Sequence, residues 1–78
     1  MRSETTNKYI KIMEDRNNAI LSLNIEEVKK YCEKYNIPIP PNERIIEEGM
    51  YIAAYKLTND ETIKNKCEKW LKKNNVEI

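Results

Sequence analysis

Three closely spaced prolines divide the chain into two parts. In the segment Ile37-Pro38-Ile39-Pro40-Pro41, each proline lacks an amide donor and disfavours the α conformation of the residue before it. The segment is therefore predicted to be a stiff, extended connector over residues 37–41. Because the chain has 78 residues, it has room for one small domain, with two helices on each side of this connector.

Hydrophobic periodicity predicts four helices. We expect them over about residues 4–22, 25–35, 43–57 and 58–74. Asn24 and Asn42 are predicted N-caps, and Thr58 with Glu61 is predicted to open the last helix as a capping box. The helix over residues 43–57 is the most apolar of the four, which favours a position in the middle of the fold.

Two apolar sides and several aromatic residues are assigned to internal packing. The first helix is expected to bury Tyr9, Ile12, Met13, Arg16, Ala19, Ile20 and Leu23, with Lys8, Lys11, Glu14 and Asp15 directed away. The stripe expected on the third helix consists of Ile46, Gly49, Met50, Ala53 and Leu57. Tyr31, Tyr35 and Trp70 are assigned to packing as well.

These elements predict an all-α fold and one domain over residues 1–78. The four helices would form two stacked helix–turn–helix hairpins, over about residues 4–36 and 43–74, because neither hairpin can bury its apolar face alone. The alternative is an irregular four-helix bundle.

A possible internal repeat of 35 residues favours the two-hairpin interpretation. Shifted by this distance, residues 19–35 match residues 54–70 at seven positions, which include Cys32-Glu33-Lys34 against Cys67-Glu68-Lys69. After a further shift of four residues, Asn36-Ile37-Pro38-Ile39 resembles Asn75-Val76-Glu77-Ile78. The alternative is a chance similarity.

The composition argues against most catalytic chemistry. The chain has no His, so it lacks an imidazole base and a His-containing zinc site, and its two Cys cannot complete a four-cysteine zinc site. One Gly is too few for a glycine-rich phosphate-binding loop. We therefore expect no enzymatic activity, no cofactor and no metal. The N-terminus lacks the apolar core of a signal peptide and no apolar run approaches a membrane span, so we expect a cytoplasmic protein with two free thiols.

Two resemblances add to these inferences. The stretch from Ala19 to Pro38, AILSLNIEEVKKYCEKYNIP, resembles one ankyrin-type helical hairpin, in which a polar turn leads into Glu-x-Val-Lys. This resemblance implies a helical hairpin repeat used for protein contact. Residues 19–57 are also similar to short proteins of phages and prophages of Gram-positive bacteria, which share the pattern AI…N.E.VKKYC…NIP.P. The second similarity implies a mobile-element origin.

One side of the third helix is the candidate protein-binding surface. It carries Tyr51, Tyr55, Arg44, Glu48 and Ile52. Tyr and Arg dominate interface hot spots, and an apolar patch of this kind on so small a chain indicates a protein partner or a homodimer. The alternative is that the first or the last helix covers the two tyrosines.

The last helix offers a different function, nucleic-acid binding. Lys66, Lys69, Lys72 and Lys73 lie on its outer side, where they could contact phosphates. Lysines near a helix C-terminus are also favoured by the helix dipole, and a solvated face is the other interpretation. A net charge of +1 and a pI near 7.7 lack the strongly basic character of most nucleic-acid-binding domains.

We therefore predict a small non-enzymatic protein–protein interaction module. It would act as an adaptor, regulator or inhibitor of another protein, including a host defence protein, or through its own dimer. A nucleic-acid-binding regulator that uses the basic last helix is the alternative.

Overall fold

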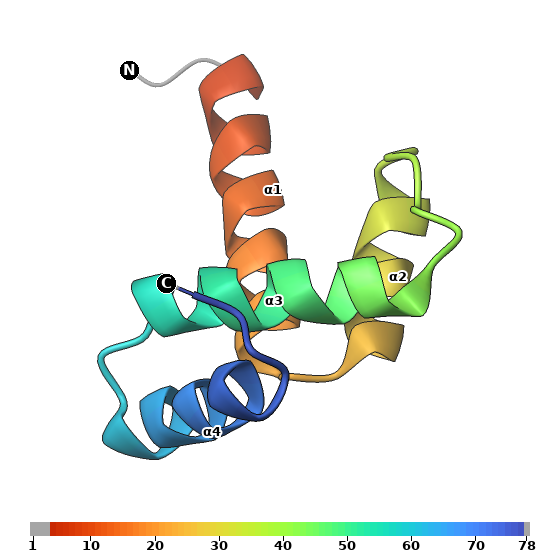
Figure 1. Ribbon diagram of the computed structural model, residues 1–78. Coiled ribbons are helices and arrows are strands. Elements are labelled where there is room, and N and C mark those ends of the chain that lie inside the picture. The colour runs from red at the N-terminus through yellow and green to blue at the C-terminus, as the bar shows by residue number, and fades with distance from the viewer. Residues whose placement is uncertain (1–3, 78) are drawn as a thin grey trace.

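Four α-helices make up the computed structural model, which describes residues 4–77 (Figure 1). They are α1 (Glu4–Leu21), α2 (Ile25–Lys34), α3 (Glu43–Leu57) and α4 (Glu61–Lys73), and no strand occurs in this range. α3 crosses the middle of the molecule and packs against each of the other helices. α1 contacts α2, and α3 contacts α4, so the predicted all-α fold with two hairpins is confirmed.

Helices α2 and α3 begin at the predicted asparagines. The side-chain oxygen of Asn24 accepts a hydrogen bond from the Glu26 amide at 2.9 Å, and that of Asn42 accepts one from the Arg44 amide at 2.8 Å. Each cap satisfies an amide that the first helical turn leaves without a partner. These two N-cap predictions are confirmed.

The predicted capping box of Thr58 and Glu61 at the start of α4 is wrong. The N-cap is Asp60, whose carboxylate accepts hydrogen bonds from the amides of Thr62 and Ile63 at 2.8 and 3.4 Å. Thr58 instead ends α3, is buried, and accepts a hydrogen bond from the Asp60 amide through its hydroxyl at 3.0 Å. The carboxylate is the better cap because it reaches two amides and also complements the helix dipole.

Helices α2 and α4 end in the same way. Asn36 and Asn75 follow their C-caps in the left-handed conformation, with φ of 55° and 56°. In each case the next amide, of Ile37 or Val76, donates to the carbonyl of the fifth residue before it, at 2.8 or 2.9 Å. Both ends are Schellman motifs, in which asparagine is a common replacement for glycine. The similarity between these two segments thus has a structural basis, although Ile78 lies outside the described residues.

The 35-residue repeat is not confirmed. It aligns Asn24 with Asn59, whereas the N-cap of α4 is Asp60. The helix ends are further apart, at Asn36 and Asn75, because α2 has 10 residues and α4 has 13. A single shift along the chain therefore does not superpose both ends of the two helices.

The core lies where α3 meets α4 and the end of α1. Its buried apolar residues are Ala19, Ile20, Ile46, Met50, Ala54, Cys67 and Leu71. α2 contributes no buried residue and packs through half-buried side chains. Both cysteines are free thiols, Cys67 fully buried and Cys32 half-buried. The core is small, since several of its side chains are Ala or Cys.

The N-terminal part of α1 protrudes from the rest of the molecule (Figure 1). Tyr9 is 64% exposed, Met13 is 56% exposed, and Arg16 is exposed as well. Among the α1 side chains that the structure describes, the buried ones are Ala19 and Ile20. The predicted burial of Tyr9, Met13 and Arg16 is therefore wrong, because α3 crosses α1 near its C-terminal end and does not run beside it.

A polar cluster holds α1 against α2. The Asp15 carboxylate accepts hydrogen bonds from the Tyr35 hydroxyl and, at 3.1 Å, from the Lys34 ammonium, and it pairs with Lys11 at 3.1 Å. The hydrogen bond from Tyr35, followed by those from the two lysines, holds the pKa of Asp15 well below its usual range. The same hydrogen bond raises the pKa of Tyr35. Periodicity predicts Asp15 to face solvent, but α2 lies next to it.

Candidate functional site

The predicted protein-binding side of α3 is engaged by α4. The Tyr51 ring stacks on the Trp70 ring, with centroids 4.6 Å apart and ring planes inclined by 13°. The Arg44 guanidinium lies over the Trp70 ring, 5.2 Å from its centroid, and donates to the Asn74 carbonyl at 3.4 Å. Burial raises the pKa of the Tyr51 hydroxyl. The interactions of Tyr51 and Arg44 therefore hold the α3–α4 hairpin together, and the assignment of Trp70 to packing is confirmed.

The other predicted partner-binding residues lie apart from this stack. Tyr55 is half-buried against the core, with the Lys64 ammonium 5.4 Å from its ring centroid. Glu48 is half-buried, and Ile52 lines a hollow on the side of α3 that faces α1. Both tyrosines are thus partly covered, and the five predicted residues do not form one exposed patch.

Three of the lysines of α4 lie beside the stacked rings. Lys66, Lys69 and Lys73 line a shallow hollow of about 250 Å³ together with the two rings. Lys72 is exposed and lies outside this hollow. The structure thus brings part of the predicted partner surface next to most of the predicted nucleic-acid surface.

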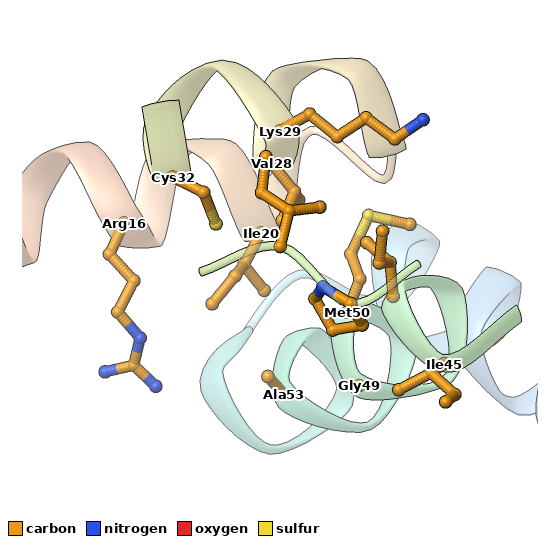
Figure 2. Close-up of a pocket in the computed structure, with 12 residues that line it drawn as sticks. Arg16, Ile20, Val28, Lys29, Cys32, Ile45, Gly49, Met50 and Ala53 are labelled. Carbon is orange, nitrogen blue, oxygen red and sulfur yellow. The ribbon is translucent and has the colours of Figure 1, made fainter. Parts of the chain in front are cut away.

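A groove runs along the opposite side of α3, where α3 faces α1. Two hollows of about 280 and 420 Å³ form it, and they are continuous because they share Arg16, Ile20, Gly49 and Ala53. We call these four residues and the hollows that they join the α1–α3 groove. In Figure 2, Ile20 and Val28 point toward the space above Gly49 and Ala53, and Arg16 descends from α1 at one side. Periodicity alone does not predict this surface.

The α1–α3 groove is apolar in its middle and basic at its edges. Neither hollow is lined by Asp or Glu, whereas Arg16 of α1, Lys29 of α2 and Lys56 of α3 all line it. Lys29 pairs with Glu43 at 2.8 Å and with Glu26 at 3.7 Å, and the hydrogen bond to Glu43 raises the pKa of Lys29. Arg16 and Lys56 form no ion pair with any side chain that the structure describes.

The only glycine of the chain lies in this groove. Gly49 is exposed in the interior of α3, and apart from its chain neighbours and the adjacent helix backbone, a Cβ atom there would meet no atom within 4 Å. The predicted buried stripe is therefore wrong at Gly49, and also at Leu57, which is 41% exposed. A helix-interior glycine costs about 1 kcal/mol relative to alanine. Packing within the chain gives no reason for this cost.

Comparison with known proteins gives no similar protein from which a function could be inferred. No family model matches the chain, and no curated protein and no solved structure matches it. The similarities to phage proteins and to ankyrin hairpins therefore stay predictions.

Within residues 4–77, no group of three or more His, Cys, Asp or Glu side chains is placed to hold a metal ion. In the same part of the chain, no helix combines the length and the apolar character needed to cross a membrane.

Proposed function

We propose that this chain is a small, non-enzymatic protein–protein interaction module, an adaptor, regulator or inhibitor, and that the α1–α3 groove is its contact surface. The observation that supports the proposal is an open apolar groove between α1 and α3, which α2 and the connector residues Ile39 and Pro40 border at one end. Tyr9 and Met13 on α1 and Ile45 on α3 add exposed apolar side chains on the two helices that form it. Apolar surface of this kind on a small monomer is typical of a protein contact site.

A groove-filling substitution tests this function. Gly49→Gln adds a long, uncharged side chain on the groove and favours the helix, so the chain should fold and its partner contact should be lost. Immobilised wild-type chain should retain specific proteins from a lysate of the source cells, and the Gly49→Gln chain should not. If the chain is encoded by a phage, as its resemblance implies, the retained protein belongs to the host.

The matched control is Asn65→Gln, at an exposed position of α4 outside the groove. It should retain the same proteins as the wild-type chain. Equal retention by the Gly49→Gln chain would contradict the proposed contact surface. Failure of the wild-type chain to retain any specific protein, together with a monomeric state in sedimentation, would contradict the proposed function itself.

A second function, nucleic-acid binding, is favoured by one observation. Lys66, Lys69 and Lys73 line a hollow without carboxylates beside the stacked rings. Because the Trp70 ring is already engaged by Tyr51 and Arg44, this surface would contact phosphates and would not stack on bases. Filter binding of duplex DNA and single-stranded RNA at low salt tests this function. Retention that is lost on substituting the three lysines by Gln would support it, and no retention of either nucleic acid would remove it.

A further inference from the structure

The charges beside the α1–α3 groove indicate which partner it accepts. Every charged residue that lines the groove is a cation. Lys29 is neutralised in part by Glu43, so the uncompensated cations are Arg16 and Lys56. These two come from different helices, α1 and α3, and both are exposed. Unpaired charges of one sign beside a groove attract and orient a partner of the opposite sign.

The length of the groove fits a helix of about three turns. α3 lines it from Ile45 to Leu57, which corresponds to about 18 Å at 1.5 Å per residue. Ile45 and Leu57 are both exposed, so each end of the groove offers an apolar side chain. A short amphipathic helix has a matching apolar stripe on one face.

The centre of the groove allows close approach. Gly49 and Ala53 lie one helical turn apart and carry almost no side chain, and the space above Gly49 is open. The distance between two packed helices depends on the side chains at their contact, and small residues shorten it. A partner helix that crosses α3 at this point would explain why a glycine lies in the interior of α3.

We propose that the α1–α3 groove binds an amphipathic helix of a partner protein, which seats about three turns of apolar residues over Gly49 and Ala53 and directs Asp or Glu residues to Arg16 and Lys56. This inference rests on the proposed function and adds the chemistry of the partner. The apolar stripe supplies most of the affinity by burial, and the acidic flanks select the partner and its orientation.

A second copy of this chain fits the groove less well. Its protruding α1 segment exposes Tyr9 and Met13, but at helical spacing the exposed charged residues beside this pair are Lys8 on one flank and Glu14 on the other. Only one flank is therefore acidic, and Lys8 would be repelled by the cations beside the groove.

Calorimetric titration with two synthetic helices tests the inference. Both probes are about 14 residues long and share one stripe of leucines at helical spacing. One probe carries glutamates on both flanks of the stripe, and the other carries lysines at the same positions. At low ionic strength the glutamate probe should bind the wild-type chain about tenfold more tightly, and added salt should reduce this difference.

Three variants assign the effect to the groove. Arg16→Glu combined with Lys56→Glu should reverse the preference, so that the lysine probe binds more tightly. Gly49→Gln should weaken both probes to a similar degree, because it fills the groove without changing its charge; its far-ultraviolet circular dichroism should match that of the wild-type chain. The control, Lys8→Glu combined with Lys30→Glu, makes the same change in net charge at exposed positions that do not line the groove. It should keep the preference for the glutamate probe.

The possible outcomes separate this inference from the proposed function. Equal affinity of the two probes, binding of neither, or a preference that the charge reversal at Arg16 and Lys56 leaves unchanged would overturn the inference. If one of these results is obtained but Gly49→Gln still abolishes protein retention from a lysate, the proposed function stands and only the acidic helix is the wrong partner. A wild-type dimer that dissociates on Gly49→Gln substitution would identify a second copy as the occupant, which also overturns the inference.

Discussion

Tyr51 and Tyr9 are the same residue type in opposite surroundings. Tyr51 stacks on Trp70 and packs against the buried core, whereas Tyr9 is exposed on the protruding part of α1. Buried aromatic area stabilises a fold, and ring stacking adds to it. The ring of Tyr51 therefore stabilises the fold, and the ring of Tyr9 is free to contact another molecule.

This contrast predicts that the same substitution, Tyr to Ala, lowers the free energy of unfolding by different amounts at the two positions. Tyr51→Ala should lower the free energy of unfolding by about 1–3 kcal/mol, because it removes the ring stacked against α4. Tyr9→Ala should change it by less than about 0.5 kcal/mol. Urea unfolding followed by circular dichroism measures both. Similar costs for the two variants would mean that the α3–α4 contact contributes little to stability.

Gly49 and Arg16 break the local pattern of their helices. A glycine in the interior of the most apolar helix and an arginine on the apolar side of α1 are both visible in the sequence. The groove cannot be predicted from either residue unless the position at which α3 crosses α1 is known. Their common role follows from the fold, which places them on two sides of one hollow.

At the scale of helices, the contact between α1 and α2 depends on titratable groups. The pKa of Asp15 is lowered in the folded chain, mainly by the Tyr35 hydrogen bond, so its contribution to stability is present above its ordinary value of 3.8 and is lost as the pH falls further. The pKa values of Lys34 and Tyr35 are raised, mainly by their hydrogen bonds to Asp15. Their contribution is present below their ordinary values of 10.5 and 10.0 and is lost as the pH rises through the raised values.

Asp15→Asn should therefore lower the melting temperature at neutral pH and weaken its dependence on acid. The wild-type chain should lose stability below about pH 4, where the carboxylate begins to be protonated in the unfolded chain. The variant, which has no carboxylate at this position, should lose less over the same range. Thermal melting monitored at a series of pH values provides the measurement. Glu14→Gln, at an exposed position of the same helix, is the control and should follow the wild-type profile.

The helices themselves were predictable because their signals are local. The prolines from Pro38 to Pro41 break the chain, and Asn24 and Asn42 cap the first turns that follow them, so neither feature requires knowledge of the tertiary fold. Burial on α1 was predicted less well, because Tyr9 and Met13 continue the apolar side of the helix beyond the point where α3 crosses it. Periodicity defines a side of a helix but not the length over which a neighbour covers it.

At the candidate site too, local features can be predicted from the sequence and contacts between helices cannot. Tyr51 and Tyr55 are prominent aromatic residues in the sequence, but their partial cover by α4 is a tertiary property. The link from Asp15 to Tyr35 also joins distant positions of the chain. Ion pairs and grooves between helices depend on helix crossing, which a single sequence does not specify.

The molecule as a whole is flat, with extents of 46 × 30 × 18 Å. Because packed helix axes lie about 8–10 Å apart, a smallest extent of 18 Å leaves room for only about two layers of helices. Each helix therefore exposes much of its surface, and the core can hold only a small number of side chains. This shape explains how one small chain has both a fully buried residue such as Leu71 and an open apolar groove.

The two cysteines provide a measure of opening of the whole fold. Cys67 is fully buried, and burial raises the pKa of its thiol, whereas Cys32 is half-buried. A thiol reagent should therefore modify Cys67, in a Cys32→Ala chain, at least about 100-fold more slowly than it modifies Cys32 in a Cys67→Ala chain.

Weakening the α3–α4 contact should increase the rate at which the reagent modifies the buried Cys67 thiol. Tyr51→Ala in the Cys32→Ala background should accelerate modification of Cys67 by about 5–150-fold, in line with a stability loss of about 1–3 kcal/mol. Labelling kinetics followed by intact mass supplies the rates. Equal rates for the two thiols in the otherwise unchanged fold would contradict the burial of Cys67.

The position of Trp70 means that the second hairpin can be observed on its own. It is the only tryptophan in the chain, and its stacking on Tyr51 places it between α3 and α4. Its fluorescence emission therefore follows the second hairpin. The rings of Tyr31 and Tyr35, 5.2 Å apart, belong to the first hairpin. A single unlabelled sample thus contains an optical signal for the joining of α3 to α4 that is independent of the polar contact between α1 and α2.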